Sequence, residues 1–527
     1  MDSSDKTSIS AEKQEDVMHI ETVGDHDKMG IDDSIEETEC GKMAWFISMA
    51  VSTGGFLFGY DTGVISAVLV TINDDLGKKL TSSEQELITS LTSGGALIGA
   101  IAAGTTADKY GRKFGIYLGC VLFIAGAIIQ AAAYNLAQMS AGRFIVGLGV
   151  GSAAMIIPLY IGELAPARYR GRMIAFDNMS VTFGQLISYA IGAAFETTNH
   201  GWRYMVGIGA APAILLLFML PKCPESPRQL ISHGKLDRAD QVLRKVFPKA
   251  TDKQIKDKIQ LILNSVHEVT AALEDKTLWW QLKQLFTVPA NARPLLSTCV
   301  VMAVSQLGGF NTLMYYSSTL FGLVGFNKPV AVSIVVGATN FIFSLVCITL
   351  LDRFGRRIVV LVTCMGMCIS LVIAAVAFSY IPISPDLTIE TREISWPGIL
   401  VLVTIICYVA FFASGVATIA WVGTELLPVE VRALGTMINT TTCWGFNIII
   451  ASTFLTMMKS MTASGAFGFY AGICFFGWLF LLFGYPECKG LPLETIRDVY
   501  THGFGVRYAA KLQKERKTAQ KNSRSQA

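Results

Sequence analysis

Charged side chains are rare in the apolar parts of this sequence, but Asp61 and Arg143 both lie well inside long apolar stretches. An isolated carboxylate in such surroundings costs on the order of a few kcal/mol, so Asp61 needs a cationic partner or a proton. Arg143 is the natural partner. Burial favours the neutral acid whereas a guanidinium favours the carboxylate, so a change in the surroundings would move a proton on or off Asp61. We therefore predict a proton-coupling pair, and the alternative is a static buried ion pair.

Asp177 is a further carboxylate, about one helical turn inside the apolar stretch 173–196. It is open to two interpretations, a second proton-binding group or an interfacial residue near Arg172. We favour the second interpretation.

Amide and aromatic side chains supply the remaining polar chemistry of the apolar stretches. Amides both donate and accept hydrogen bonds, so they suit a neutral, polyhydroxylated ligand. Asn178 and Gln185 are seven residues apart and share one helix face, and the pair Gly308-Gly309 allows close approach or unwinding. For any single amide the alternative is hydrogen bonding between helices. The predicted substrate-binding residues are Asn178, Gln185, Gln306, Asn311, Trp421 and Asn447.

The composition defines the elements that must position these residues. The 527 residues include 43 Lys and Arg and 40 Asp and Glu, which is 16% charged against 52% hydrophobic. Soluble proteins average about 25% charged residues. Most of the charges fall in 1–42, 222–294 and 486–527. This pattern excludes a compact soluble enzyme, a disordered chain and, with a net charge of only +3, a nucleic-acid binder.

The rest of the chain forms twelve apolar stretches, and a helix of about 20 apolar residues crosses a bilayer. We predict an all-α membrane protein with twelve transmembrane helices arranged as two six-helix repeats. The predicted spans are 43–66, 87–107, 115–134, 138–161, 173–196, 203–221, 295–321, 330–351, 357–379, 397–423, 433–458 and 465–485. The predicted segments are a disordered tail (1–42), a six-helix bundle (43–221), a loop (222–294), a second bundle (295–485) and a tail (486–527).

The short polar segments indicate how the chain is oriented in the bilayer and which parts lie outside it. Lys and Arg concentrate in the loops after the second, fourth, eighth and tenth spans, which predicts that both termini and the central loop are cytoplasmic. Within that loop, 235–247 and 253–270 each carry a helical apolar stripe, so we expect two short amphipathic helices there.

A set of acidic and basic residues occurs once in each half. Glu425 follows Glu163 by 262 residues, and Glu487 follows Glu225 by the same number. We interpret the set as a conformational gate whose cross-helix ion pairs form when the halves close on the inner side, and the alternative is ordinary positive-inside topology. The predicted gating residues are Asp108, Arg112, Glu163, Arg170, Glu225 and Arg228, with Asp352, Arg356, Glu425, Arg432 and Glu487.

Several motifs resemble the sugar porters of the major facilitator superfamily over about residues 43–500. They are Gly59-Tyr-Asp61-Thr-Gly63, Gly142-Arg143-Phe144, Pro158-x4-Glu163-x2-Pro166, Pro224-Glu-Ser-Pro-Arg228 and Gly309-Phe-Asn311 with Tyr315-Tyr316. The stretches 324–343 and 450–457 look closest to fungal proton-coupled myo-inositol transporters. The resemblance implies the major facilitator fold, a proton-coupling role for Asp61 and Arg143, and sugar contacts from the amides named above.

The sequence also departs from that family at positions expected to touch the substrate. Ser305-Gln306 stands where two glutamines are usual, Ala420-Trp421 replaces Pro-Trp, and Cys443-Trp444 replaces Asn-Trp. Asn178 replaces a common glutamine, a feature that inositol transporters share.

The expected function is secondary active transport, the proton-coupled uptake of myo-inositol or a related polyol or sugar by alternating access. The alternatives are an exporter of a small fungal metabolite on the same fold and a nutrient receptor that binds without transport. An enzyme is not expected, because no nucleophile–base set or metal cluster is apparent, and no cofactor is expected apart from the coupling proton. The expected partners are a small neutral polyol or sugar, a proton and the lipid bilayer, with no nucleic acid. The expected location is the plasma membrane.

Overall fold

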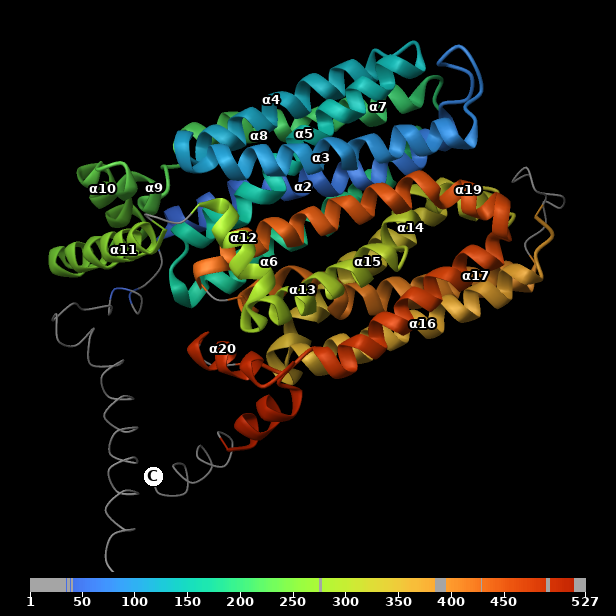
Figure 1. Ribbon diagram of the computed structural model, residues 1–527. Helices are drawn as coiled ribbons and strands as arrows, with labels where there is room; N and C mark the ends of the chain where they lie inside the picture. Colours follow the sequence, from blue (N-terminus) through green and yellow to red (C-terminus); the bar gives the residue numbers. More distant parts are fainter. Residues whose placement is uncertain are drawn as a thin grey trace, which may run out of the picture.

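The computed structural model describes residues 41–273, 277–383, 395–427, 429–489 and 493–515, together with Ile35 and Thr38. The predicted disordered tail 1–42 lies largely outside these residues. Figure 1 shows an elongated bundle of long helices with a group of short helices at one end.

The first six predicted spans form the N-terminal half of the bundle. Its helices are α2 (Lys42–Thr71), α3 (Ser82–Tyr110), α4 (Arg112–Ala131), α5 (Leu136–Leu164), α6 (Ala167–Phe195), and the consecutive α7 (Gly201–Ile208) and α8 (Ala210–Met219). The chain then makes a short 3-10 turn at Leu220–Lys222.

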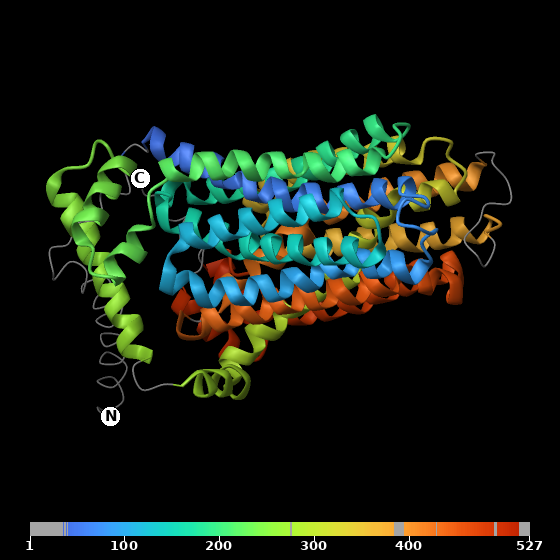
Figure 2. The same ribbon diagram turned by 90° about the horizontal axis from the view of Figure 1, so that it is seen from above.

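The central loop is helical, as its apolar stripes predict. It contains α9 (Pro227–Ser232), α10 (Leu236–Val246), α11 (Asp252–Leu273) and α12 (Leu278–Thr287). Arg244 of α10 contacts Asp240 of the same helix and Asp252 at the start of α11, at 2.7 and 2.5 Å. Figures 1 and 2 both place α9, α10 and α11 beyond one end of the bundle, which we call the α10 end.

The last six predicted spans form the C-terminal half. Its elements are α13 (Pro289–Leu307), α14 (Phe310–Leu323), α15 (Pro329–Phe354), α16 (Arg356–Ser379), α17 (Trp396–Phe411), a π-helical turn (Phe412–Val416), α18 (Ala417–Val422), a 3-10 turn (Gly423–Leu426), α19 (Val429–Gly484) and α20 (Leu493–Thr501). Within α19, Thr462 has a φ of 66° and marks the kink between the eleventh and twelfth predicted spans.

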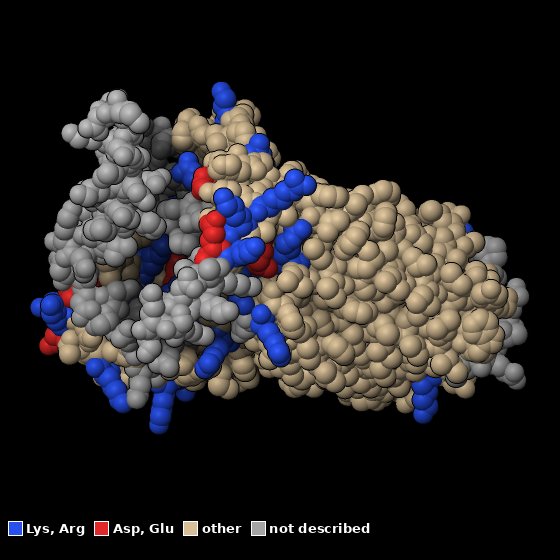
Figure 3. Space-filling view, turned by 90° about the horizontal axis from the view of Figure 1, so that it is seen from below, with Lys and Arg blue, Asp and Glu red and all other residues tan. Residues whose placement is uncertain are grey.

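Ten helices among the described residues are long and apolar enough to cross a membrane. The stretch counted within α19 covers two predicted spans. The fifth predicted span, α6, is not among the ten although it is 29 residues long, because its first turns are charged and polar residues such as Asn178 and Gln185 lower the hydropathy of the rest. All twelve predicted spans are therefore helical. In Figure 3 charged side chains gather toward the α10 end, while most of the bundle surface on this face is uncharged.

The seventh span is interrupted where the glycine pair predicts a break. Helix α13 ends at Leu307 and α14 begins at Phe310, and Gly309 between them has a φ of 91°. A side chain is disfavoured at this position for two reasons, because L-residues rarely adopt that φ and because a Cβ would lie 2.8 Å from the Tyr470 ring. The break redirects the chain just before Asn311.

The two halves meet along three helix pairs: α3 packs against α19, α6 against α15, and α2 against α14. The largest buried apolar cluster extends across this boundary, since it includes Val64 and Tyr189 of the N-terminal half with Leu313 and Tyr316 of α14. Polar side chains on these same helices face one another across the boundary, and they form the site described next.

Candidate functional site

The predicted charged pair forms inside the N-terminal half. Arg143 of α5 donates from Nη1 to Asp61 Oδ1 of α2 at 2.7 Å. Arg143 is 1% exposed and Asp61 6% exposed. Arg143 also donates from Nε to the backbone carbonyl of Ile88 in α3 at 3.3 Å. The guanidinium therefore connects three helices, and Asp61 has the partner that its burial requires.

Three of the predicted substrate-binding amides form one cluster. Gln306 Oε1 accepts hydrogen bonds from Asn311 at 2.6 Å and from Asn447 at 3.3 Å. Asn447 Oδ1 in turn accepts from Ser93 of α3 at 2.9 Å and from Tyr315 at 3.2 Å. The break between α13 and α14 brings Gln306 and Asn311 together, and Ser93 connects the cluster to the opposite half.

A second polar contact between the halves involves the predicted Gln185. Asn340 of α15 donates to Gln185 Oε1 of α6 at 2.6 Å, and both side chains are buried. Sequence reasoning had not assigned Asn340 to the site. The available signal was an amide within an apolar stretch, the same signal that identifies Asn447.

The other two predicted substrate-binding residues are placed differently. Asn178 is exposed on α6, and no described hydrogen bond joins it to the amide cluster. Trp421, near the end of α18, is 37% exposed. Trp444 of α19, by contrast, is buried and packs against Phe58 of α2 with ring centroids 5.6 Å apart. Trp444 therefore lies at the boundary between the halves.

Asp177 does not behave as the favoured interfacial interpretation expects. Its side chain is buried in α6, whereas Arg172 is exposed. Asp177 Oδ1 has no hydrogen-bond partner among the described residues. Helix α2 approaches closely here, because a Cβ on Gly55 would lie 2.6 Å from that oxygen.

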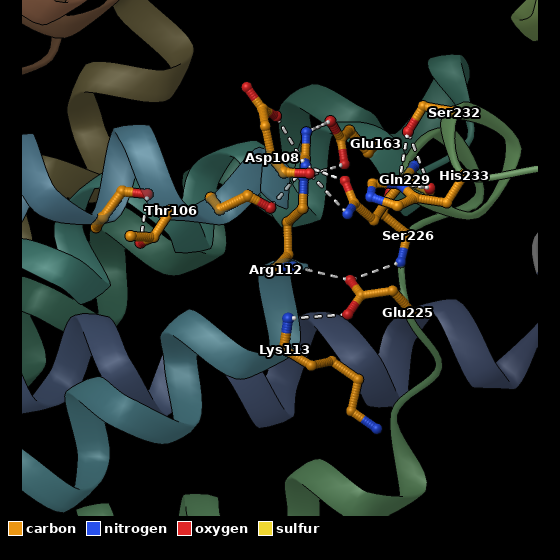
Figure 4. A network of polar contacts seen from close by, with 12 residues as sticks. Thr106, Asp108, Arg112, Lys113, Glu163, Glu225, Ser226, Gln229, Ser232 and His233 are labelled. Atoms are coloured by element: carbon orange, nitrogen blue, oxygen red, sulfur yellow. Dashed lines mark hydrogen bonds and ion pairs between the residues drawn. The ribbon is translucent and has the colours of Figure 1, made fainter. Parts of the chain in front are cut away.

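Four of the predicted gating residues of the N-terminal half, Asp108, Arg112, Glu163 and Glu225, form one network at the α10 end (Figure 4). Arg112 lies at its centre, 2.9 Å from Asp108 and 2.9 Å from Glu163. It also donates to Gln229 of α9. Glu225 accepts from the backbone N–H groups of Arg112 and Lys113 at 3.0 and 3.3 Å, and so caps the N-terminus of α4.

The C-terminal half repeats the helix cap. Glu487 accepts from the backbone N–H of Arg357 at 3.0 Å, near the start of α16. The Arg357 side chain donates to carbonyls at the end of α19, including Leu482 at 2.7 Å. Arg432 donates to the Leu427 carbonyl at 3.0 Å.

These contacts show where the predicted gating residues lie. The contacts of Arg112, Glu163 and Glu225 join elements of the N-terminal half, and those of Glu487 join helices of the C-terminal half. The gating role of these residues therefore stays a prediction. Arg170 and Arg228 are exposed and Arg356 is half-buried, while the side chains of Asp352 and Glu425 lie outside the described residues.

Further direct polar contacts between the halves lie toward the end opposite α10. Ser66 of α2 forms hydrogen bonds of 2.9 Å with Ser317 and with Ser318 of α14. Glu86 of α3 accepts two hydrogen bonds from Thr456 of α19. In this structure, therefore, the halves are joined at that end.

Comparison with known proteins identifies the family. Residues 47–500 match the family model described as "Sugar (and other) transporter". The chain belongs to the sugar transporter family. It is 44% identical to Myo-inositol transporter 1 of Cryptococcus neoformans var. grubii over 484 residues, which cover 91% of this chain and 85% of that protein. It is 42% identical to Myo-inositol transporter 1 of Candida albicans over 495 residues, which cover 93% and 89% of the two chains.

Solved structures of a sugar transporter have the same fold. The partially occluded inward-open conformation of the xylose transporter XylE from E. coli has a TM-score of 0.72 at 26% identity, with 86% of this chain and all of that chain covered. The proton:xylose symporter XylE bound to 6-bromo-6-deoxy-D-glucose has a TM-score of 0.71 at 26% identity, with 87% and 99% covered. The predicted major facilitator fold and the predicted family are confirmed.

The arrangement of the charged pair and the amide cluster indicates which chemistry this member of the sugar transporter family can perform. In the Asp61–Arg143 pair, the charge of a buried carboxylate is balanced by one guanidinium. The amide cluster presents several donors and acceptors and no net charge, which matches a polyol. Among the described residues no group of three His, Cys, Asp or Glu is arranged to hold a metal ion.

Proposed function

We propose that this chain carries myo-inositol, or a closely related polyol, across a membrane together with a proton by alternating access. The observation that carries the proposal is the buried Asp61–Arg143 pair, which is connected through α3 to an uncharged amide cluster at the boundary between the halves. Support for the polyol comes from relatives named as myo-inositol transporters at 42–44% identity. Support for the proton comes from the proton:xylose symporter of the same fold.

The coupling would follow from the chemistry of the pair. When Asp61 is ionised it holds Arg143, and α2, α3 and α5 are bound together. When Asp61 takes a proton, Arg143 loses its counter-ion and that connection weakens. A group that alternates between a paired and a protonated state lets proton binding and helix rearrangement drive each other.

The substrate would bind at the boundary between the halves. Asn311 and Gln306 are hydrogen-bonded to each other, and so are Asn340 and Gln185. A polyol hydroxyl both donates and accepts, so it can replace either partner without leaving an amide unsatisfied. Substrate binding would therefore exchange contacts between the halves for contacts to the ligand.

The orientation follows from the loops. We propose that the α10 end is cytoplasmic, because Lys and Arg concentrate in the short loops there. The structure would then be joined on its exterior side. Uptake into the cell through the plasma membrane is the corresponding direction.

The test is uptake of labelled myo-inositol by proteoliposomes that contain the full-length protein, with and without an inward proton gradient. We expect saturable uptake that the gradient drives above equilibrium and that a protonophore returns to equilibrium. Uptake that ignores the gradient would contradict proton coupling. The absence of both inositol binding and uptake would favour export of a different metabolite on the same fold.

A further inference from the structure

Glu86 is a buried carboxylate that belongs neither to the Asp61–Arg143 pair nor to the amide cluster. It is 4% exposed. One of its oxygens accepts from the backbone N–H of Thr456 at 2.8 Å, and the other accepts from the Thr456 hydroxyl at 2.7 Å. No Lys or Arg forms an ion pair with it among the described residues. These two hydrogen bonds therefore supply the polar compensation that burial of a carboxylate requires.

The contact joins the two halves at the end opposite α10. Helix α3 begins at Ser82, so Glu86 lies about one turn inside it. Thr456 lies on α19 six residues before the kink at Thr462, where the chain turns back toward the α10 end. The Ser66–Ser317 contact also lies toward this end. Separation of the halves here must break both Glu86 hydrogen bonds.

The same segment of α3 also contacts the coupling pair and the amide cluster. The Ile88 carbonyl, two residues after Glu86, accepts from Arg143. Ser93 lies seven residues after Glu86, on the same helix face, and donates to Asn447. Two turns of α3 thus contact Arg143, the amide cluster and Thr456.

Glu86 can also leave Thr456 without a large penalty. Opening of this end would admit water, which can hydrate the carboxylate in place of the two Thr456 donors. The Glu86 carboxylate therefore has hydrogen-bond donors both when this end is closed and when it is open. A buried apolar contact at the same place could not exchange its partner for water in this way. A carboxylate between two sets of donors is suited to a closure that must form and break in every cycle.

We propose that Glu86 is a positioning residue that holds the end opposite α10 closed by binding Thr456, and that the coupling pair and the substrate cluster act on this closure through α3. The inference rests on the proposed alternating access. Release of Arg143 from Asp61 changes its contact with Ile88, and replacement of Ser93 by a substrate hydroxyl changes the contact with Asn447. Both changes alter how the outer turns of α3 lie against α19.

The first test measures the closure without any substrate. Hydrogen–deuterium exchange of the full-length protein follows peptides that cover residues 452–461. We expect exchange in Glu86→Ala to be roughly tenfold faster than in the wild type, since hydrogen bonds to a charged group are lost. Thr456→Val keeps the backbone donor and should be intermediate, while Thr456→Ser keeps both donors and should match the wild type.

Glu84→Gln is the matched control. Glu84 lies two residues earlier on the same helix, but it pairs with Lys78 and caps its own helix within the N-terminal half. Glutamine at this position preserves a capping box, so exchange at 452–461 should not change. Equal exchange in Glu86→Ala and Glu84→Gln would overturn the proposal. If Glu86→Ala does not fold, Glu86→Gln and Thr456→Val provide the same comparison.

The second test measures the cycle. In right-side-out vesicles, loss of the closure enlarges the population open to the exterior, so external inositol should bind roughly tenfold more tightly. The maximal rate of net uptake should fall. A double variant, Glu86→Ala with Thr456→Val, should match Glu86→Ala alone, and additive effects would overturn the pairing. If the wild type transports no inositol, the proposed substrate fails, but the exchange measurement still decides the role of Glu86.

Discussion

Arg143 forms a 2.7 Å ion pair with Asp61 and at the same time donates to the Ile88 carbonyl, so one guanidinium holds α2 and α3 against α5. Both charged side chains are buried. Removal of one partner of a buried pair typically costs about 3–5 kcal/mol, because the other charge is left uncompensated. A proton on Asp61 has the same effect on Arg143, which is why protonation can act on helix positions.

Asp61→Asn should uncouple transport while the fold is preserved. The amide can still accept a hydrogen bond from Arg143 but cannot take up a proton. We expect inositol accumulation driven by a proton gradient to be lost, whereas counterflow exchange of labelled for unlabelled inositol continues. In the wild type, one proton contributes about 2.3 kcal/mol per 100 mV and about 1.4 kcal/mol per pH unit to the inositol gradient. The wild type should therefore accumulate far more inositol than Asp61→Asn.

The control for that measurement is Asp74→Asn, which neutralises an exposed carboxylate in the loop between α2 and α3. It should accumulate inositol as the wild type does. Asp61→Ala should be less thermostable than Asp61→Asn, because alanine leaves Arg143 without an acceptor. Gradient-driven accumulation in Asp61→Asn at the wild-type level would show that another group carries the proton.

Gln185 and Asn340 should contribute to inositol affinity as a pair. Their 2.6 Å hydrogen bond joins α6 to α15 across the boundary between the halves. Asn340→Ala leaves the Gln185 acceptor unsatisfied and removes a ligand group, so we expect the dissociation constant to rise roughly tenfold. A double-mutant cycle of Gln185→Ala and Asn340→Ala, read by equilibrium binding, should give non-additive effects.

Ser344→Ala is the comparison for that cycle. Ser344 lies one turn after Asn340 on α15, but among the described residues its hydroxyl bonds only to the Asn340 carbonyl of its own helix. It should bind inositol normally. Strictly additive effects of the Gln185 and Asn340 substitutions would argue that the two side chains bind the substrate independently or not at all.

The sequence predicts local features of this fold well. The length of each apolar stretch predicts the twelve spans, and Gly308-Gly309 predicts the break in the seventh. The pairing of Asp61 with Arg143 was also predictable, because each buried charge needs an opposite one and few were available. These features depend on hydropathy, backbone freedom or charge balance, which single positions reveal.

Contacts between the halves were harder to predict. Asn340 and Glu86 stand out in sequence only as polar residues in apolar helices, and nothing local indicates which neighbouring helix each one faces. Arg112 and Glu163 were predicted to form cross-helix ion pairs, but nothing in the sequence indicated that they would pair with each other inside one half. Periodicity places a residue on a helix face, but the packing of twelve helices decides what that face contacts.

Glu225 and Glu487 should stabilise their own halves by capping helices. Each accepts from backbone N–H groups in the first turn of α4 or α16. Substitution of a helix cap typically costs about 0.5–2 kcal/mol, so Glu225→Ala and Glu487→Ala should each lower the melting temperature by roughly 2–4 °C. Glu515→Ala, at an exposed pair with Lys511, should leave it unchanged. A decrease as large in Glu515→Ala would contradict the capping role.

Asp75 should make stability depend on acid pH. It lies in the loop between α2 and α3, and its Oδ2 contacts His200 Nδ1 at 2.7 Å and accepts from Trp202 Nε1 at 2.6 Å. Partial burial raises the pKa of the Asp75 carboxyl, but the contacts with His200 and Trp202 outweigh it, and the pKa lies below its ordinary value. A carboxyl whose pKa is lowered on folding stabilises the protein above its unfolded pKa, about 3.9.

That contribution is lost as the pH falls through the folded pKa of Asp75. The wild type should therefore melt at a higher temperature than Asp75→Asn at pH 6, and the difference should shrink as the pH falls below about 4. Melting curves of the detergent-solubilised protein between pH 3 and 6 measure this. Asp74→Asn, which changes the neighbouring exposed carboxylate, should run parallel to the wild type across the range. A difference in melting temperature between the wild type and Asp75→Asn that stays constant with pH would mean that Asp75 stabilises the fold through its packing and neutral hydrogen bonds and not through its charge.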